Sequence, residues 1–433
     1  MALSERRIAL LFTVFCGLIV IAGIRAGYLG AFQSPALQKA ADQQQVAKTT
    51  IPAPRGTILD RRGVELAVSQ PAADISANPL LIKQPLDVAR KVAPLIGESE
   101  ADVLREISAK DTGFVYLKRR VPADNALKIS KMGIEGIDST PASKRTYPRR
   151  ALASQVLGAV GTEGNGLMGL EELYEKDLRG VDGKRKLTSD ALGEPIDVED
   201  AVSTQPGKDI SLTIDGAIQA RAEKVIADVG AKFQPKGATA VVMDPRTSEI
   251  LAMANWPAVE ADKLGDAPPY QRQNRAVGMT YEPGSTFKAF TVSAALNDGV
   301  VTPDSAFGLA PTIQVADRTI EESHPRGFES LTTRQIIAQS SNVGSVVIGL
   351  KLGAKRFSQW VDKFGFGHPT GVDLPGEEVG IVPQLKDYSG STMGNMPIGQ
   401  GIAVTPMQMA AGYSAIANGG VLKQPEIVHE ING

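Results

Sequence analysis

An uncharged apolar run near the N-terminus constrains the folding of this 433-residue chain most strongly. Residues 8–24 contain no charge and no proline, and they follow Arg6 and Arg7. A helix rises about 1.5 Å per residue, so this run nearly covers a ~30 Å hydrocarbon core if Arg25 and Tyr28 lie at the far interface. We therefore expect one membrane-spanning helix, with a cleaved signal peptide and a buried core helix as the alternatives.

The charges beside this run predict its orientation. Positively charged flanks stay in the cytoplasm, so Arg6 and Arg7 keep the short N-terminus there and send the rest of the chain outside. The expectation is a single-pass protein of the cell (inner) membrane with a cytoplasmic N-terminus. Cys16, the only cysteine, lies inside the run, so no intrachain disulfide can form.

Charge and composition exclude two classes of site. Lys+Arg 46 against Asp+Glu 48 gives a formal net charge of -2, which leaves no basic field for nucleic acid. The three histidines, His324, His368 and His429, lie far apart in the sequence. With a single cysteine they cannot build a Cys/His zinc cluster, so a metal site would need carboxylates alone.

Composition along the chain predicts three regions: 1–30 as cytoplasmic tip and anchor, 31–205 as one exported domain and 206–433 as another. A polar stretch at 38–48 leads into Pro52 and Pro54, and Pro206-Gly207 marks the later boundary. In the first exported domain, residues 57–69 predict a β-hairpin with a turn at 60–63, and 86–110 have helical spacing.

The second exported domain opens with a helix and a hairpin. Asp215 is the predicted N-cap of a helix. The residues predicted to share its apolar face are Ile218, Ala222, Val225, Ile226 and Val229. Residues 238–256 contain two short apolar runs joined by Pro245-Arg246-Thr247-Ser248, which predicts an antiparallel hairpin buried on both faces.

The first candidate for chemistry is a Ser-x-x-Lys motif. Pro283-Gly284 begins a predicted helix and Gly299 ends it, and Ser285 and Lys288 share a face of the first turn. A serine becomes a nucleophile when a neighbour takes its proton, and a buried, positive helix N-terminus favours the neutral amine of lysine. The same turn offers backbone N–H groups to a developing oxyanion. The spacing therefore predicts Ser285 as nucleophile and Lys288 as base.

A second motif, Ser340-Ser341-Asn342, falls at the junction of two predicted helices. Thr332 and Gln335 form a capping box that opens the first helix, and Gly353 closes the second. At that junction Ser340 is placed to relay a proton to a leaving amine, and the amide of Asn342 to hold a peptide carbonyl. The alternative is that both residues only cap the following helix.

Further motifs accompany these two along nearly the whole chain. Glu282 to Lys288 reads EPGSTFK, and Ser340-Ser341-Asn342 follows it. The others are Arg55-Gly56, Asp60-Arg61-x-Gly63, Arg145-x-Tyr147-Pro148, Gly169-Leu170-Glu171, Gly399-Gln400-Gly401 and Thr405-Pro406. Together they resemble class B penicillin-binding proteins, the monofunctional D,D-transpeptidases of bacterial wall synthesis. Glu282 before Pro-Gly-Ser resembles the division branch of that family.

The resemblance implies a multi-domain α+β fold. A single transmembrane helix would precede a mixed α/β pedestal domain and a transpeptidase domain of helices on a five-stranded antiparallel sheet. It implies that Ser285 attacks the penultimate D-alanine carbonyl of a stem pentapeptide, and that Lys288, Ser340 and Asn342 complete the catalytic set, with Asn342 also binding substrate. An amine of a second stem would then form the crosslink.

The resemblance also implies partners and a location. The expected ligands are peptidoglycan stem peptides and β-lactam antibiotics, which acylate the same serine. The expected protein partners are a polytopic glycosyltransferase of the shape, elongation, division and sporulation (SEDS) group and other division proteins. The catalytic domain would be extracytoplasmic, and no metal or organic cofactor is implied.

One departure from the family pattern leaves alternatives open. The third motif of the family, Lys-Thr/Ser-Gly on a strand that lines the cleft, does not occur in the 433 residues. We therefore expect a transpeptidase domain that is incomplete at its C-terminus, with the remaining strands beyond Gly433 and these 433 residues inactive by themselves. The alternatives are a non-catalytic pedestal or scaffold protein, and a β-lactam sensor or serine β-lactamase.

Overall fold

The N-terminal element is a single long helix. The computed structural model describes residues 2–28, 46–109, 111–189 and 195–432. In α1 (Ala2–Tyr28), the stretch Leu10–Tyr28 has 19 residues and a mean hydropathy of 2.1, long and apolar enough to cross a membrane. The predicted N-terminal apolar helix is confirmed. Most of the linker predicted at 38–48 lies outside the described residues.

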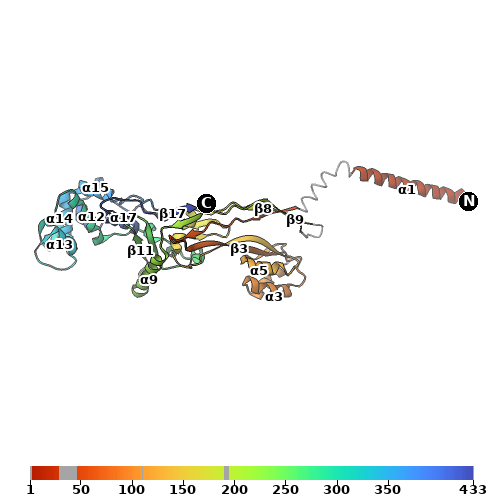
Figure 1. Cartoon of the computed structure of the whole chain (residues 1–433), viewed down its shortest axis with the longest axis horizontal. Coiled ribbons are helices and arrows are strands. Elements are labelled where there is room, and N and C mark those ends of the chain that lie inside the picture. The colour runs from red at the N-terminus through yellow and green to blue at the C-terminus, as the bar shows by residue number, and fades with distance from the viewer. Residues whose placement is uncertain (1, 29–45, 110, 190–194, 433) are drawn as a thin grey trace. The chain divides into compact units, whose positions relative to one another are not determined.

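The chain divides into two compact units, residues 1–53 with 181–205 and residues 54–180 with 206–433. The first unit holds α1 and an antiparallel sheet in the order β1-β8-β9, whose strands β8 and β9 are marked in Figure 1. The strands are β1 (Val46–Ile51), β8 (Gly183–Ser189) and β9 (Pro195–Val202). The chain therefore enters the second unit twice, at Pro54 and at Pro206.

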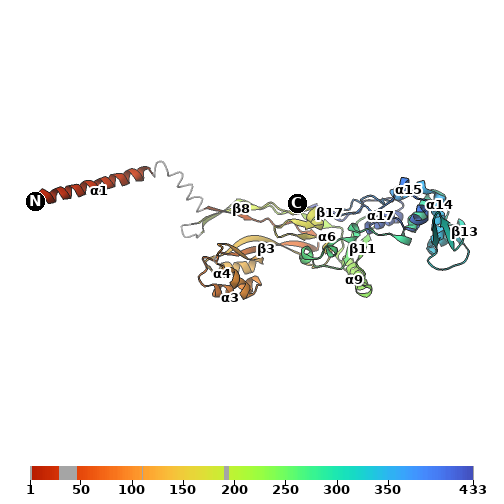
Figure 2. The same cartoon turned by 180° about the vertical axis from the view of Figure 1, so that it is seen from behind.

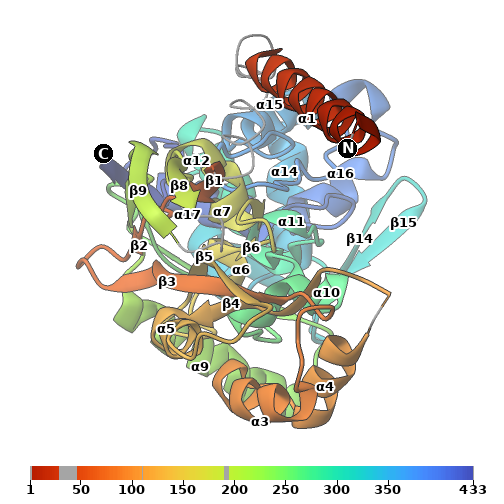
Figure 3. The ribbon, with the colours of Figure 1, turned by 90° about the vertical axis from the view of Figure 1, so that its right-hand side faces the viewer.

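A six-stranded sheet lies in the second unit and joins strands from distant parts of the chain. Its order is β17-β10-β2-β3-β4, and β5 also pairs with β3. Of these strands, β2, β3, β4 and β5 are labelled in Figure 3. The strands are β2 (Ile58–Leu59), β3 (Glu65–Ala77), β4 (Val115–Pro122), β5 (Ile137–Thr146), β10 (Asp209–Leu212) and β17 (Val428–Asn432). β2 and β3 form the hairpin predicted around residues 60–63. The antiparallel pairing of β17 with β10 was not predicted.

Three helices pack on the β3–β4 part of this sheet, and two of them, α3 and α4, are labelled beside β3 in Figure 2. They are α3 (Pro85–Ile96), α4 (Glu100–Ser108) and α5 (Ala123–Ser130). The helical spacing predicted over 86–110 is present as two helices, because Gly97 takes a left-handed φ of 72° and Ser99 caps the next helix by accepting from the Asp102 N–H. Their apolar faces and β3 form one core.

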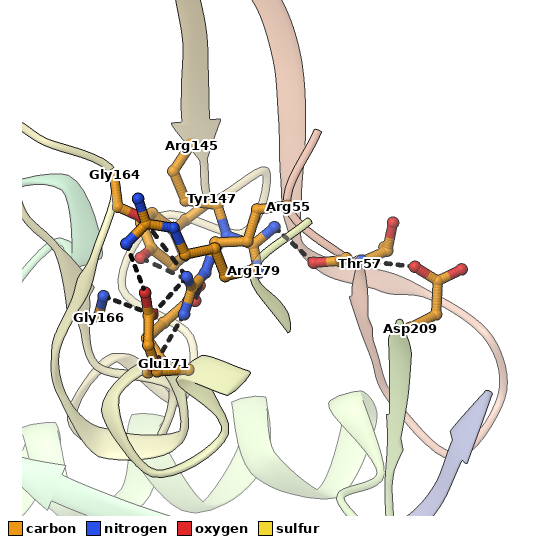
Figure 4. A network of polar contacts seen from close by, with 11 residues as sticks. Arg55, Thr57, Arg145, Tyr147, Gly164, Gly166, Glu171, Arg179 and Asp209 are labelled. Carbon is orange, nitrogen blue, oxygen red and sulfur yellow. Dashed lines mark hydrogen bonds and ion pairs between the residues drawn. The ribbon is translucent and has the colours of Figure 1, made fainter. Parts of the chain in front are cut away.

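A buried polar network ties the short elements after β5 to the start of β2 (Figure 4). The Glu171 carboxylate accepts from Arg55 Nε at 2.5 Å and from Arg145 Nε at 2.6 Å, and Arg145 also donates to the Gly56 carbonyl at 2.7 Å. Arg55 reaches Glu175 as well, at 2.5 Å. The short elements are α6 (Ser154–Leu157), β6 (Ala159–Val160), β7 (Gly166–Met168), α7 (Gly169–Leu173) and α8 (Glu175–Leu178). Three motifs that are far apart in sequence therefore meet in one ion-pair cluster.

The helix and hairpin predicted after residue 208 are present, but their burial differs from the prediction. Asp215 is the N-cap of α9 (Gly216–Phe233), and its carboxylate accepts from two backbone N–H groups. After this helix, β11 (Ala238–Met243) pairs with β12 (Ile250–Trp256). The prediction of one buried apolar face on α9 was wrong, since Val225 is 47% exposed. The buried positions are Gln219, Ile226 and Gly230.

The prediction that the hairpin is buried on both faces was wrong for β11. β12 is largely buried, but β11 is half-buried throughout and Val242 is 36% exposed. An open apolar groove of about 460 Å³ runs between α9 and β11 and accounts for this exposure. In the part of the chain that the structure describes, these two strands form a sheet of their own.

Helices and short hairpins make up the remainder of the second unit. The helices next to the predicted motifs are the 3-10 turn η3 (Gly284–Phe287), α12 (Lys288–Asn297), α13 (Thr333–Ala338), α14 (Asn342–Leu352), α15 (Ala354–Lys363) and α17 (Pro406–Ala417). The hairpin strands are β13 (Ala306–Leu309), β14 (Thr312–Val315), β15 (Arg318–Glu321) and β16 (Glu329–Thr332). The short helices are η2 (Ala261–Asp266), α10 (Pro269–Arg272), α11 (Arg275–Gly278), η4 (Leu385–Asp387), α16 (Thr392–Asn395) and η5 (Met396–Ile398).

An aromatic cluster fixes α12 among these helices. Phe287 and Phe290 are buried and pack against Phe366, with ring centroids 5.1 and 5.0 Å apart. The opposite side of α12 packs on α14 through a second apolar cluster that includes Val292 and Val343. Because α12 is held on both sides, its first turn has a fixed position relative to α14.

Candidate active site

Ser285 and Lys288 lie on one face of a tight turn. Ser285 is in η3, a 3-10 turn that continues directly into α12, and the Lys288 N–H donates to the Ser285 carbonyl. Residues three apart are eclipsed in a 3-10 turn, so the two side chains point the same way. Ser285 is exposed and Lys288 is buried. The predicted helix is confirmed, with Gly299 at φ 66° just beyond its end.

The Lys288 ammonium lies against the second predicted motif. Its Nζ donates to the Ser340 carbonyl at 2.6 Å, to Ser340 Oγ at 3.1 Å and to Asn342 Oδ1 at 2.6 Å. Only 2% of Lys288 is exposed, and this burial lowers its pKa to about 8, although the nearby Glu322 carboxylate opposes the shift. Lys288, Ser340 and Asn342 are therefore in direct contact, as their motifs predict.

These contacts define what the amine can do in each protonation state. An ammonium has three N–H donors, and the three acceptors around Lys288 use all of them. The neutral amine has two donors and one lone pair, so it can accept a proton from a hydroxyl. Among the described residues, no hydrogen bond joins Ser285 to Lys288. Ser340 Oγ, 3.1 Å from the amine, is the hydroxyl in contact with it, and Ser285 lies on the same face of the turn as Lys288.

Ser340 occupies a strained backbone position. It lies between α13 and α14 with φ 55°, in the left-handed region that residues with a side chain rarely adopt. The capping box predicted at Thr332 and Gln335 is present and starts α13, and Gly353 ends α14. The strained residue is therefore held from both sides by regular helices, and its hydroxyl faces Lys288.

The amide of Asn342 is fixed in orientation by a backbone carbonyl. Nδ2 donates to the carbonyl of Glu321 at 2.7 Å, which turns Oδ1 toward Lys288. The second N–H of this amide has no acceptor among the described residues and is free to donate. The sequence predicted Asn342, but it carried no signal that the strand end at Glu321 would hold it.

A glycine-rich segment, residues 399–401, clamps the turn that carries Ser285 from the other side. The Gly284 N–H donates to the Gly399 carbonyl, and the Gly401 N–H donates to Glu282 Oε1, both at 2.9 Å. A Cβ on Gly399 would lie 2.1 Å from the Gly284 carbonyl oxygen, so only glycine allows this approach. The family resemblance pointed to residues 399–401, but their contact with the turn that carries Ser285 could only be seen in the structure.

Metal ligands are not gathered at this site. Within residues 2–28, 46–109, 111–189 and 195–432, no group of three or more His, Cys, Asp or Glu side chains is placed to hold a metal ion. The groups that face one another here are a hydroxyl, an amine, a second hydroxyl and an amide. Such a set is suited to nucleophilic acyl transfer with proton transfer between neighbours.

Two family models match the chain. Residues 50–212 match the "Penicillin-binding Protein dimerisation domain" and residues 238–433 match the "Penicillin binding protein transpeptidase domain". Stage V sporulation protein D of Bacillus subtilis is 33% identical over 97% of this chain and 66% of its own length. The probable peptidoglycan D,D-transpeptidase PbpC of Pseudomonas aeruginosa is 31% identical over 97% of this chain and 75% of its own length.

Solved structures agree with these relatives. Penicillin Binding Protein 2X from Streptococcus thermophilus has a TM-score of 0.73 and 27% identity, covering 89% of this chain and 61% of its own. The chain spans about two thirds of the length of the curated relatives that it matches, 66% and 64% for two of them. On these matches and on the fold, the chain belongs to the class B penicillin-binding proteins.

Proposed function

We propose that the full-length protein is a serine-type D,D-transpeptidase that crosslinks peptidoglycan stem peptides and is a target of β-lactams. The convergence of Lys288 on Ser340 and Asn342, one turn from an exposed Ser285, is the observation that carries the proposal. The name of the Pseudomonas relative, a probable peptidoglycan D,D-transpeptidase, supports it.

In the proposed reaction, Ser285 Oγ attacks the carbonyl carbon of the penultimate D-alanine while neutral Lys288 takes the hydroxyl proton. The C–N bond to the last D-alanine breaks, and Ser340 passes a proton to the leaving amine, since its Oγ lies 3.1 Å from Lys288 Nζ. An amine of a second stem then attacks the acyl-enzyme ester, the C–O bond to Ser285 breaks, and the proton that the amine loses returns to Ser285 Oγ through Ser340 and Lys288. The free N–H of the Asn342 amide holds a substrate carbonyl throughout.

We also propose a location and a role in the cell. Arg6 and Arg7 before the apolar stretch favour a cytoplasmic N-terminus and an extracytoplasmic catalytic domain. Glu282 before Pro-Gly-Ser favours septal wall synthesis, in company with a glycosyltransferase of the SEDS group and other division proteins. A fluorescent-protein fusion that gathers at the division site would support this role, and uniform labelling of the side wall would contradict it.

Product analysis tests the proposed activity. The full-length protein, supplied with polymerised pentapeptide-bearing glycan strands, should release D-alanine and form crosslinks that mass spectrometry of digested glycan detects. Ser285→Ala should abolish both products, and Ser330→Ala, which removes an exposed hydroxyl from β16, should not. A folded wild-type protein that forms neither product would favour a non-catalytic scaffold.

A further inference from the structure

A carboxylate that the proposed reaction does not use lies directly behind the Ser340–Asn342 segment. Glu322 follows β15, and only 8% of its side chain is exposed. Its Oε2 accepts from the Asn342 N–H at 2.7 Å, and its Oε1 accepts from Ser341 Oγ at 2.6 Å and from the Val343 N–H at 3.3 Å. These N–H groups open α14 and have no acceptor within the helix. Glu322 therefore caps the element that carries Asn342.

The position of this carboxylate is itself fixed. Arg326 donates to Glu322 Oε1 at 2.6 Å, and its other nitrogen donates to the Leu309 carbonyl of β13 at 3.1 Å. Arg326 is 13% exposed, so the ion pair is shielded from most of the solvent. A carboxylate held by a counter-ion, a hydroxyl and two N–H groups cannot move away when the charge near it changes.

The segment that carries Glu322 also controls the amide next to it. The carbonyl of Glu321 accepts from Asn342 Nδ2 at 2.7 Å, and this contact points Asn342 Oδ1 at Lys288, 2.6 Å from Nζ. One short stretch after β15 thus sets both the backbone and the side chain of Asn342. The orientation of the Asn342 amide toward Lys288 therefore depends on that stretch.

We propose that Glu322 is a positioning residue for the acylation step, which fixes the start of α14 so that Asn342 stays against Lys288, and which stabilises the ammonium that forms when Ser285 gives up its proton. The proposal rests on the proposed function, because it names a group that supports the same base. Among the described residues no hydrogen bond joins Glu322 to Ser285, so Glu322 acts through α14 and through its charge.

The electrostatics of the two groups agree with this geometry. Burial lowers the pKa of Lys288 to about 8, and among the described residues Glu322 is the charged group that raises it. Burial opposes the ionisation of Glu322, but hydrogen bonds from Ser341, Arg326 and the Asn342 N–H outweigh it and lower its pKa. Arg326 is the charged group in contact with Glu322. Glu322 is therefore an anion at the pH at which Lys288 gains and loses its proton.

The test compares the pH dependence of β-lactam acylation in Glu322→Gln and wild-type full-length protein. Glutamine keeps the shape and one accepting oxygen but removes the charge, so Lys288 should lose its proton more easily. The acid limb of the rate profile should move to lower pH by roughly one unit, and the plateau rate should fall about tenfold because the base is weaker. Glu322→Asp keeps the charge, so its acid limb should stay with that of the wild type even if the rate falls.

The matched control is Asp317→Asn, which removes an exposed carboxylate at the other end of β15 and should leave the profile unchanged. If the acid limb of Glu322→Gln stays where it is in the wild type, the proposal is overturned whatever the plateau rate, and Glu322 is a helix cap only. If the wild type is not acylated, the proposed function fails instead. Nitrogen NMR of labelled lysine then still tests Glu322, because the Lys288 titration needs no turnover and must move in Glu322→Gln.

Discussion

Lys288 is held between two opposing effects. Its side chain is almost fully buried, which disfavours the charged form, while three acceptors and the Glu322 carboxylate favour it. Burial is the larger effect, and the pKa falls from 10.5 to about 8. A lysine in such a site exchanges its proton near neutral pH, which is the requirement for a base that must first accept and then return a proton.

The pH dependence of acylation follows from this pKa. Below about pH 8 the neutral amine is the minor form, so the acylation rate should rise about tenfold per pH unit and level off above that value. Lys288→Arg keeps the charge but cannot supply a neutral amine, so its rate should fall by at least about 100-fold. Stopped-flow acylation with a fluorescent penicillin measures both. A flat profile, or an arginine variant as fast as the wild type, would exclude Lys288 as the base.

Two substitutions at Ser340 distinguish the effect of its backbone strain from the effect of its hydroxyl. Its φ of 55° costs a residue with a side chain about 1 kcal/mol or more relative to glycine. Ser340→Gly should therefore be more stable to thermal unfolding than Ser340→Ala, although both remove the hydroxyl near Lys288. Both variants should be acylated more slowly than the wild type. Equal melting temperatures for the glycine and alanine variants would mean that the backbone at this position is not strained.

At the scale of elements, the sequence predicted features that depend on neighbouring residues, such as caps and turns. It missed features that depend on packing against distant elements. The capping box at Thr332 and Gln335, the N-cap at Asp215 and the turn at 60–63 depend on neighbouring residues, and all three are present. The buried face of α9 depends on what lies beside it. Two of its predicted apolar positions, Val225 and Val229, are exposed, and Val225 lines the groove beside β11, which periodicity alone cannot show.

The contact of residues 399–401 with the turn that carries Ser285 leads to a prediction for two glycines. Gly399→Ala would place a Cβ 2.1 Å from the Gly284 carbonyl oxygen, so the turn that carries Ser285 must shift, and acylation should slow by roughly 100-fold. Gly401→Ala is the matched control. Its φ of 68° imposes similar backbone strain, but the nearest neighbour of a Cβ there is Asn395 at 3.8 Å. Equal acylation rates in the two variants would contradict the clamp.

Across the whole molecule, motifs that are far apart in the sequence meet in three dimensions. Arg55, Arg145 and Glu171 form the buried cluster of Figure 4, although 116 residues separate the first from the last. The motifs could be recognised in the sequence, but their meeting could not, because nothing local encodes a contact across that separation. In the same way Ser285, Lys288, Ser340 and Asn342 were predicted as a set, whereas Glu322 was not.

The buried cluster should dominate the stability of its part of the fold. Glu171→Gln removes the carboxylate between two buried guanidinium groups, and an uncompensated buried charge typically costs about 3–5 kcal/mol. Glu172→Gln changes an exposed neighbour and should alter the free energy of unfolding by less than about 0.5 kcal/mol. Chemical denaturation measures both. If the two variants unfold at the same denaturant concentration, the cluster does not stabilise the protein.

The identity of the acylated residue tests the central claim most directly. The full-length protein would be incubated with a fluorescent penicillin, digested, and mapped by mass spectrometry. We predict one covalent adduct per chain, on Ser285, and no adduct in Ser285→Ala. An adduct on any other residue, or labelling that persists in Ser285→Ala, would contradict the active site described for Ser285, Lys288, Ser340 and Asn342.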